Sequence, residues 1–500
     1  IKMRMSEVVR MMTPLVPVMD NCWADIMFFF VPKRLVWDHW QAFWGENDTE
    51  PWIQKIDYTV PKIVAPDNGW EVGSLAEKLG WPIGVGKIET DALPVRSYLK
   101  IWNDWFRDEN LKNPAYISTG DSTTQGTAMS EYTEEDPYDY VEDAETGCAL
   151  LKVAKPHDMF TTALPGLQKG PDIYIPLGTS APVNWGENET YAPDLYPTDE
   201  RMIDKQAIIT RSTDLYASAV DDTTPPTLYD LQNSHALSLY TDLSNAVGAT
   251  LTALRQSFAI QRYYEALSRG GSRYIEIIRN VFGTTAPDYR LQRSEYVGGF
   301  RLPINISQVI QSDAGATDAT PLGHTGAYSM TADRHDDLFD HAFVEHGVLM
   351  GVMCIRTDHT YSQGIDRQFT KFNLFDWYTP QLANLSESAI LNKEIYAQGT
   401  SEDEEAFGYQ ECWYEYRNHK NIVTGELRVD APQSLSVWTY ADHYTELPKL
   451  GDEWIDETPD NIARTIAVEN HDQFFFDIFF KPTYVRPMPV YSIPGLTSHF

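Results

Sequence analysis

The sequence predicts a mainly β protein in which long loops connect the strands. Apolar runs that are rich in aromatic and β-branched residues and lack a helical period occur toward both ends, at residues 25–31, 345–356, 409–417 and 473–485. The 30 prolines are spread along all 500 residues, which suits ordered loops better than packed helices. Clear helical periodicity is found in two segments, residues 92–111 and 248–269.

The first helical segment, ALPVRSYLKIWNDWFRDENL, spans residues 92–111. Its apolar stripe is formed by Leu99, Trp102 and Phe106, which recur at i, i+3 and i+7, and Trp105 lies on the flank of that stripe. The opposite face is charged. We therefore expect an amphipathic helix that buries its aromatic side against another surface.

Charge is distributed unevenly along the chain. The net charge is −33, from 39 basic and 72 acidic residues, so the protein as a whole repels nucleic acid. Residues 255–301, which start inside the second predicted helix, nevertheless hold eight arginines against four acids. Six of these arginines are candidates either for contact with a polyanion or for ion pairs between copies of the chain: Arg255, Arg262, Arg269, Arg273, Arg290 and Arg293.

Two segments resemble insertions. Residues 118–147 are rich in Ser, Thr, Gly and acids, which predicts an acidic surface loop. Residues 183–245 show no clear period and combine many acids with scattered aromatic residues. Exposed aromatic rings of this kind can recognise a partner or hold copies of the chain together. The aromatic residues singled out in this insertion are Trp185, Tyr191, Tyr196, Tyr216 and Tyr229.

No motif of known catalytic chemistry is present. The sequence lacks GxSxG and HExxH, and residues 84–88 do not have the spacing of a phosphate-binding loop. Acids and histidines gather in residues 335–346, but a strand over residues 347–355 would separate His341 from Glu345. The four cysteines form no CxxC pair, which predicts free thiols. We therefore expect no enzyme activity, no bound metal and no cofactor.

Seven segments identify a family resemblance. In chain order they are MTPLVPVMDN (12–21), FVPKRLVWDHW (30–40), TALPGLQKGP (162–171), RGGSRYIE (269–276), LNKEIYAQGT (391–400), FGYQE (407–411) and RPMPVYSIPGL (486–496). Together with residues 92–111 they resemble the major capsid proteins of the Microviridae, and specifically those of the gokushovirus branch. The pattern departs from the family at Leu167, where proline is more usual.

The resemblance implies a specific architecture and function. Residues 1–500 would form one eight-stranded antiparallel jelly-roll barrel, with long loop insertions and a few short α-helices. Sixty copies would build a T=1 icosahedral shell around a circular single-stranded DNA genome. Residues 183–245 would form protrusions at the threefold axes and contact a host cell-surface receptor. The family also implies an internal scaffolding protein, a DNA pilot protein and a small basic DNA-packaging protein as partners.

Assembly would take place in the host bacterial cytoplasm, with the finished chain in the virion. In that setting the six arginines face the genome or a subunit interface, and three buried tryptophans, Trp102, Trp105 and Trp413, contribute to subunit contacts. An alternative from another class is a secreted β-sandwich protein that binds carbohydrate or hydrolyses glycosides, with Trp and Tyr as sugar platforms. The two hypotheses differ in whether the chain forms closed particles.

Overall fold

The computed structural model describes most of the chain. The described residues are 1–46, 58–121, 148–171, 173, 251–270, 274–285, 287, 292–312, 322–468 and 471–486, with the backbone of five short strands between residues 183 and 241. The chain divides into two compact units. The larger unit comprises Ile1–Lys169 and Glu265–Phe500, and the smaller comprises Gly170–Tyr264.

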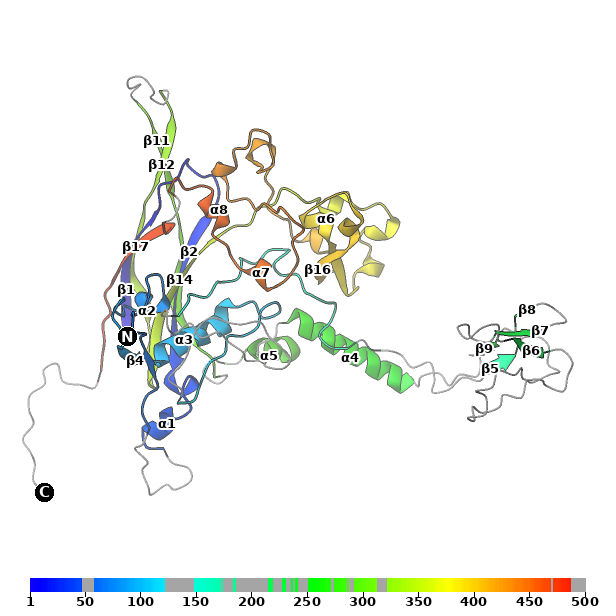
Figure 1. The fold of residues 1–500 in the computed structure, drawn as a ribbon, viewed down its shortest axis with the longest axis horizontal. Coiled ribbons are helices and arrows are strands. Elements are labelled where there is room, and N and C mark those ends of the chain that lie inside the picture. The colour runs from blue at the N-terminus through cyan, green and yellow to red at the C-terminus, as the bar shows by residue number, and fades with distance from the viewer. Residues whose placement is uncertain are drawn as a thin grey trace, which may run out of the picture. The chain divides into compact units, whose positions relative to one another are not determined.

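Two three-stranded antiparallel sheets form the centre of the larger unit (Figure 1). The β1 sheet has the order β13–β1–β17 and contains β1 (Lys2–Met11), β13 (Thr331–Asp340) and β17 (Phe474–Phe480). The β2 sheet has the order β10–β2–β14 and contains β2 (Cys22–Pro32), β10 (Glu295–Pro303) and β14 (Gly347–Thr357). The chain passes from one sheet to the other between β1 and β2, between β10 and β13, between β13 and β14, and between β14 and β17.

The two sheets pack face to face because each turns one apolar face inward. Along β1 every second residue is buried, as period-2 alternation requires. Met3 and Met5 of β1 share an apolar cluster with Ile26 and Phe28 of β2 and with Phe339 of β13. A second cluster continues this core toward the far ends of the strands. The result is a β-sandwich core.

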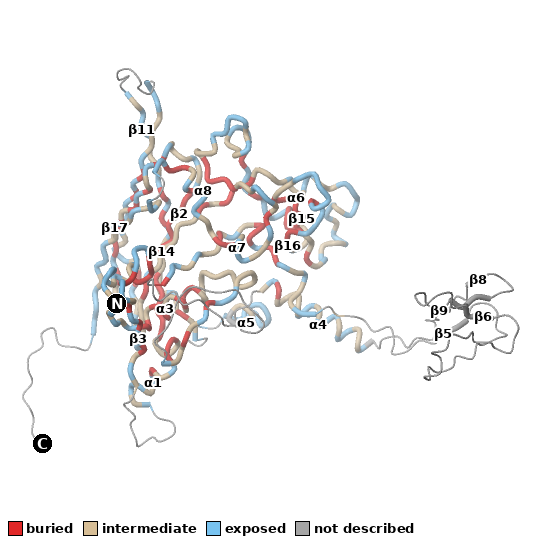
Figure 2. The backbone as a smooth tube through the Cα atoms, viewed as in Figure 1, coloured by how far each residue is buried: buried red, intermediate tan, exposed pale blue. Residues whose placement is uncertain are grey.

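The β2 sheet is buried on its other face as well. Strand β2 is an almost continuous apolar run, which is typical of a central strand covered on both sides. On the face away from the β1 sheet, Phe29 and Val31 pack against Trp37 and against Leu93 and Ile101 of helix α3 (Leu93–Ile101). Figure 2 shows buried residues concentrated along β2, whereas β17 is mostly exposed.

A long hairpin joins the two sheets at one end. Strands β11 (Ile306–Ile310) and β12 (Thr325–Ser329) pair antiparallel and continue directly from β10 and into β13. Below this ladder the two arms separate, and one enters each sheet. The separation point is tied by two hydrogen bonds: Asn305 N donates to Thr331 Oγ1 (2.9 Å), and Ser329 Oγ donates to the Asn305 carbonyl (2.9 Å).

The predicted amphipathic helix is confirmed, although it is shorter than residues 92–111. Helix α3 continues into one π-helical segment, Trp102–Phe106, and Arg107 is already extended. Leu99 and Trp102 are buried in one cluster, with Phe106 packed against it, so the predicted stripe faces the core. The π segment widens the last turn and carries Trp105 onto the β2 sheet, where its ring lies 5.3 Å from that of Phe29.

Short elements complete the larger unit. The remaining described strands of the larger unit form two two-stranded antiparallel sheets, β3 (Lys62–Val64) with β4 (Glu89–Asp91) and β15 (Glu387–Leu391) with β16 (Ala406–Glu411). The short helices are α1 (Trp40–Phe43), α2 (Leu75–Lys78), α5 (Tyr274–Phe282), α6 (Asn392–Ile395), α7 (Asp452–Ile455) and α8 (Asp460–Ala463). Helix α4 (Leu251–Arg269) is the longest described helix and ends at Arg269, the predicted last residue of the segment 248–269.

The predicted mainly β fold with short helices is confirmed, and in the described residues the sheets form layers that do not close into a barrel. Of the four predicted strands, 25–31 and 345–356 are confirmed, and 473–485 is confirmed as the shorter β17. The strand predicted at residues 409–417 is wrong beyond Glu411, because Trp413 adopts a left-handed conformation (φ 68°) and a 3₁₀ turn follows.

All four cysteines are free, as expected. Burial raises the pKa of the Cys22 thiol to about 12, so that this thiol stays protonated at neutral pH. In the described part of the chain, no helix has both the length and the apolar character needed to cross a bilayer.

Candidate functional site

The predicted arginines fall into distinct environments. Arg255 and Arg262 are exposed on α4, and their spacing of seven residues puts them on one helical face. Arg269, at the end of the same helix, forms a charge-assisted hydrogen bond with Glu387, whose side chain is 1% exposed. Arg273 and Arg290 lie outside the described residues.

Arg293 and Trp105 are brought together although they are far apart in the sequence. The Arg293 guanidinium carbon lies 3.8 Å from the centre of the Trp105 ring, which is close enough for a cation–π interaction. The indole N–H of Trp105 donates to the carbonyl and to the hydroxyl of Ser294 (3.1 and 3.0 Å). Asp104 accepts from Ser294 N (2.8 Å), which fixes the start of β10 against the π segment.

A buried carboxylate links the three strands of the β2 sheet. Asp25 of β2 accepts from Arg301 of β10 at 2.6 and 3.0 Å and from Arg356 of β14 at 2.5 Å. Burial alone would raise the pKa of Asp25, but hydrogen bonds from the two guanidinium groups lower it below its ordinary value. Arg301, one of the eight arginines in residues 255–301, is therefore engaged within its own chain.

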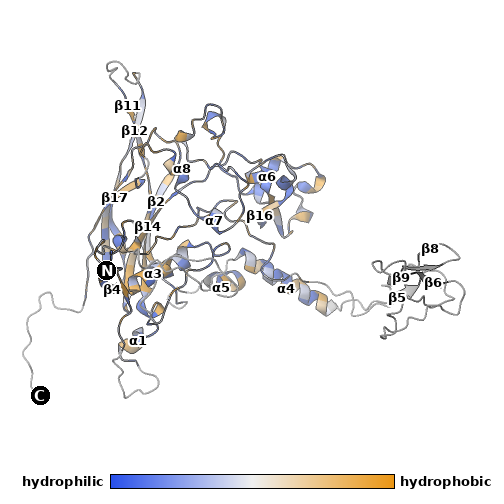
Figure 3. Cartoon of the chain, in the orientation of Figure 1, coloured by the Kyte–Doolittle hydropathy of each residue, from blue (hydrophilic) through white to orange (hydrophobic). Residues whose placement is uncertain are grey.

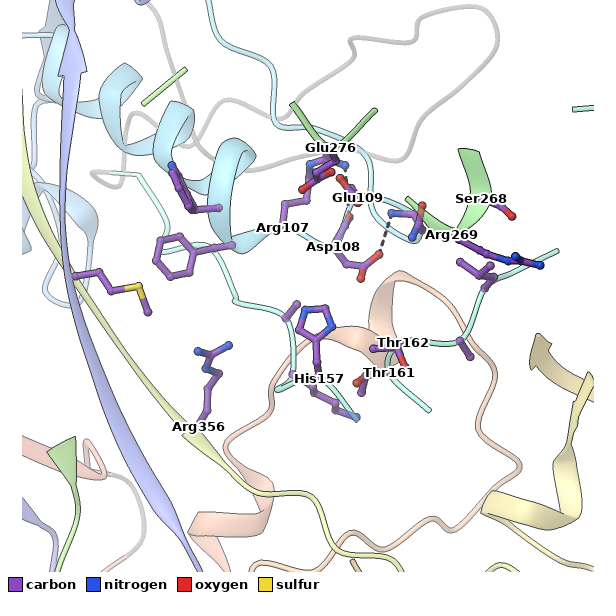
Figure 4. A pocket seen from close by; sticks show the side chains of 18 residues that line it. Arg107, Asp108, Glu109, His157, Thr161, Thr162, Ser268, Arg269, Glu276 and Arg356 are labelled. Atoms are coloured by element: carbon purple, nitrogen blue, oxygen red, sulfur yellow. Dashed lines mark hydrogen bonds between the residues drawn. The ribbon is translucent and has the colours of Figure 1, made fainter. Parts of the chain in front are cut away.

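A cavity of about 430 Å³ lies beside this network (Figure 4). Its wall is formed by the segment after α3, by residues 154–164, by the end of α4 and by strands β2 and β14. Two predicted residues, Trp105 and Arg269, line it together with groups that the sequence did not single out. The charged and imidazole groups in the lining are Arg107, Lys155, His157, Arg269, Arg356, Asp108, Glu109 and Glu276.

The hydroxyl groups in this lining serve the backbone. Thr161 donates to the Pro156 carbonyl (3.0 Å), Thr162 to the Asp158 carbonyl (2.5 Å) and Ser268 to the Glu265 carbonyl (3.0 Å). A nucleophilic hydroxyl needs a base within hydrogen-bond reach, and these three donate to carbonyl oxygens instead. The three hydroxyl groups of the described lining are therefore engaged with the backbone.

The predicted contact tryptophans have different exposures. Trp102 is 2% exposed and donates to the Lys152 carbonyl (2.8 Å), so its contacts lie within its own chain. Trp413 is partly exposed and donates to the Leu382 carbonyl (2.9 Å). Its ring lies 5.7 Å from that of Tyr378 and 6.4 Å from that of Tyr416, both of which are about half exposed.

Tyr378 belongs to a strongly exposed apolar segment that the sequence analysis missed. We call residues 369–378 the aromatic loop. Six of its side chains are 49–82% exposed: Phe369, Phe372, Leu374, Phe375, Trp377 and Tyr378. Contiguous exposed apolar groups of this size mark interaction sites in monomeric proteins. The sequence signal was available, since KFNLFDWY places five apolar residues within eight.

The aromatic loop is held in shape by its own polar groups. The Asp376 carboxylate accepts from the backbone N–H groups of Asn373 (2.7 Å) and Phe372 (3.0 Å), and these bonds lower its pKa. Lys371 forms an ion pair with Glu415 (2.6 Å), and its ammonium lies 3.9 Å from the centre of the Tyr416 ring. The loop therefore presents its rings from a fixed backbone, which lowers the entropic cost of binding.

The outer face of the β1 sheet is a second open surface. Strand β1 turns Arg4 and Arg10 outward, and both are exposed. Opposite Arg10 lies Phe475 of β17, and Phe479 follows on the same face; they are 53% and 63% exposed. Figure 3 shows β17 as strongly hydrophobic. Basic and aromatic side chains therefore share this face with one acid of β17, Asp477, which lies between the two phenylalanines and opposite Val8.

The inserted segment is described only as backbone. In the smaller unit β5 (Val183–Trp185) pairs with β9 (Leu239–Thr241), and β7 (Thr227–Asp230) pairs with β6 (Leu215–Ser218) and β8 (His235–Ala236). Tyr216 is in register with Tyr229, and Trp185 ends β5. Tyr191 and Tyr196 lie outside the described residues, as does most of the acidic loop at 118–147.

Layered antiparallel sheets and a large preformed aromatic surface are typical of a structural protein that binds further chains. The comparisons agree. A family model described as "Capsid protein (F protein)" matches residues 1–496, and the chain belongs to this family. Three curated relatives, each named capsid protein VP1, are similar over nearly the whole chain.

The relatives come from three phages. The chain is 37% identical to the protein of Spiroplasma virus 4, over 99% of this chain and 89% of that protein. It is 36% identical to the protein of Bdellovibrio phage phiMH2K, over 100% of this chain and 90% of that protein. It is 33% identical to the protein of Chlamydia phage 1, over 97% of this chain and 89% of that protein. The predicted resemblance to Microviridae capsid proteins is thereby confirmed. The chain is a phage capsid protein, a structural component of the virion and not an enzyme, and the carbohydrate-binding alternative is not supported.

Proposed function

We propose that 60 copies of this chain form a T=1 icosahedral shell around a circular single-stranded DNA genome. Membership of the capsid family supports assembly from many copies. The proposal assigns the eight strands β1, β2, β10, β11, β12, β13, β14 and β17 to one jelly roll. The paired sheets support this assignment, because the chain crosses between them four times, as the repeated crossings of a jelly roll require.

The aromatic loop is the observation that carries the proposal. A fully buried Phe contributes about 1.5–3 kcal/mol, and Phe372 (82%) and Phe375 (74%) are among the most exposed rings of the described residues. A neighbouring copy that covers them would gain this stabilisation at every repeat of a closed shell. Trp413 joins this contact through Tyr378 and Tyr416. Trp105 contributes to this contact indirectly, because its hydrogen bonds to Ser294 hold the start of β10 in place.

The outer face of the β1 sheet supports the genome contact. Single-stranded DNA binds where cationic groups meet phosphates and aromatic rings stack on bases. Arg4 and Arg10 beside Phe475 and Phe479 supply both groups, and Arg255 and Arg262 on α4 add a basic helical face. Because the chain carries a net charge of −33, the small basic DNA-packaging protein supplies further neutralisation. The internal scaffolding protein and the DNA pilot protein complete the proposed set of partners.

The inserted segment at residues 183–245 is proposed as the threefold protrusion that contacts a host cell-surface receptor. The support is a separate compact unit, Gly170–Tyr264, which contains its own paired strands and the aromatic residues at 185, 216 and 229. Such a unit can vary without disturbing the sandwich core. Deletion of residues 183–245 is expected to leave particle assembly intact and to abolish adsorption to host cells.

The assembly proposal is tested by replacing Phe372 and Phe375 together with aspartate. The matched control is Val72→Asp with Val344→Asp, which adds the same two charges at apolar positions that are 74% and 98% exposed. Negative-stain electron microscopy should show uniform closed particles for the wild type and the control, and dispersed subunits for the double variant. Circular dichroism should show unchanged secondary structure in all three. Closed particles from a folded double variant would contradict the proposal.

A further inference from the structure

An acid lies at a core position of the sandwich. Strand β1 points Met3, Met5, Glu7, Val9 and Met11 inward in strict alternation. The Glu7 side chain is 0% exposed, and neither of its carboxylate oxygens has a hydrogen-bond partner. An unsatisfied buried carboxylate is costly, so a charged group of this kind requires an explanation.

Two further side chains converge on Glu7. Asp333 of β13 lies directly opposite Glu7 in the register, and His335 follows on the same face, opposite Met5. His335 Nε2 lies 3.4 Å from Glu7 Oε1 and 3.6 Å from Asp333 Oδ2. This imidazole nitrogen is also buried without a hydrogen bond. Three potential ligand atoms, one from each residue, lie within 4.8 Å of one another.

The two distances from His335 Nε2, 3.4 and 3.6 Å, match a small coordination sphere. Zn²⁺ binds histidine nitrogen and carboxylate oxygen at about 2.0–2.2 Å, so neighbouring ligand atoms in a tetrahedral site are about 3.3–3.6 Å apart. One imidazole with two carboxylates suits zinc better than calcium or magnesium, which prefer oxygen ligands alone. Asp333 is 49% exposed, so the site opens to solvent on one side and leaves room for a water ligand.

The surroundings hold the histidine in place. The ring of His335 lies 3.8 Å from that of Phe300, which belongs to β10 of the opposite sheet. A register irregularity lies next to it, between the pairs Met3–Phe339 and Met5–His335. Bulges of this kind re-aim side chains in a sheet and frequently occur at binding sites. The imidazole is therefore oriented before any ligand arrives.

We propose that Glu7, Asp333 and His335 form a binding site for a divalent transition metal, with Zn²⁺ as the expected ion. The metal would join the N-terminal strand β1 to β13 and satisfy the buried carboxylate. This site is independent of the proposed shell geometry and of the genome contact. It also revises the expectation of no metal, which considered His341 and Glu345; these lie in the loop between β13 and β14, where Glu345 pairs with Arg34 (2.8 Å).

The test is zinc binding by the purified, untagged full chain, measured by isothermal titration calorimetry after chelator treatment. We expect one equivalent of Zn²⁺ per chain. Glu7→Gln and His335→Gln should each weaken binding by at least about 100-fold, since even a lost outer-shell contact costs 10–100-fold. The matched control is Asp336→Asn, which removes an exposed acid of the same strand.

Spectroscopy and thermal unfolding distinguish a preformed metal site from nonspecific metal binding. Co²⁺ in place of Zn²⁺ should give the intense visible absorption of four-coordinate cobalt, and this signal should be absent in Glu7→Gln. Zn²⁺ should raise the unfolding midpoint of the wild type and of Asp336→Asn but not of the two site variants. Absence of stoichiometric binding, equal binding by a folded Glu7→Gln or His335→Gln protein, or displacement by equimolar Ca²⁺ would each overturn the proposal.

Discussion

The two sheets of the sandwich differ in how much of their surface their own chain covers. The β2 sheet is buried on both faces: β1 and its neighbours cover one, and α3 with Trp37 and Trp105 covers the other. The β1 sheet is buried on one face alone, and its outer face carries exposed arginines and phenylalanines. The β2 sheet is therefore stabilised within the subunit. The β1 sheet and the aromatic loop keep surfaces that assembly can cover.

The largest expected effect comes from the covered sheet. Phe29→Ala removes a ring that is 0% exposed at the centre of β2 and should destabilise the dissociated subunit by about 3–5 kcal/mol. Phe479→Ala removes a ring that is 63% exposed and should change the stability of the dissociated subunit by less than about 0.5 kcal/mol. Urea unfolding of both variants measures the difference. Equal destabilisation would remove the distinction between the two sheets.

The next largest effect on stability comes from removing the negative charge of Asp25. Asp25→Asn weakens the bonds to Arg301 and Arg356 and should cost about 2–3 kcal/mol, less than a fully buried pair because Arg301 is half exposed. The control Glu411→Gln removes an exposed pair with Arg417 and should cost less than about 1 kcal/mol. Urea midpoints provide the comparison. An Asp25→Asn variant with the same stability as the wild type would show that the three strands need no shared carboxylate.

A buried histidine predicts how stability depends on pH. His359, just after β14, contacts Asp442 (2.7 Å) and Glu457 (3.3 Å). Burial alone would lower its pKa, but these two carboxylates raise it to about 10. Since the folded-state pKa exceeds the ordinary 6.5, the stabilisation is complete below about pH 6.5 and is lost as the pH rises toward 10. Thermal unfolding midpoints should fall over this interval.

The variant His359→Gln tests this assignment directly. Its unfolding midpoint should be lower than that of the wild type at pH 6, and the gap should narrow steadily toward pH 10. The variant should thus lose most of the alkaline dependence. A wild-type midpoint that stays constant from pH 6 to pH 10 would show that His359 does not carry this charge.

The smallest effect concerns the open face of the β1 sheet. Arg4→Gln with Arg10→Gln should leave subunit stability nearly unchanged and weaken binding of single-stranded oligonucleotides. The logarithm of the binding constant falls linearly with the logarithm of the salt concentration, and the magnitude of this slope should decrease by about 1.4, which corresponds to two lost phosphate contacts. Arg417→Gln, on a different surface, is the control. An unchanged salt dependence would exclude this face as the genome contact.

Local signals in the sequence predicted the elements whose own residues decide their structure. The stripe of Leu99, Trp102 and Phe106 predicted α3, and the uninterrupted apolar run predicted β2, because burial on both faces needs apolar residues throughout. Strand β1 was missed although its period of two is regular. That alternation also contains the signal for Glu7, since an acid at a core position in such a pattern is unusual.

Other features depend on partners that are distant in the sequence. The strand predicted at 409–417 ends early because Trp413 turns to bond the Leu382 carbonyl and Tyr414 bonds the buried Glu394. Arginine spacing alone could not show that Arg269 pairs with Glu387 or that Arg293 stacks on Trp105. These contacts result from the tertiary fold, and no local pattern encodes them.

The central claim is that neighbouring copies or the genome cover the surfaces that the single chain leaves open. A cryo-electron microscopy reconstruction of the assembled particle measures this most directly. We predict a neighbouring subunit packed on the aromatic loop at residues 369–378, and protein or DNA density against the outer face of the β1 sheet. A closed particle in which both surfaces face bulk solvent would contradict the account.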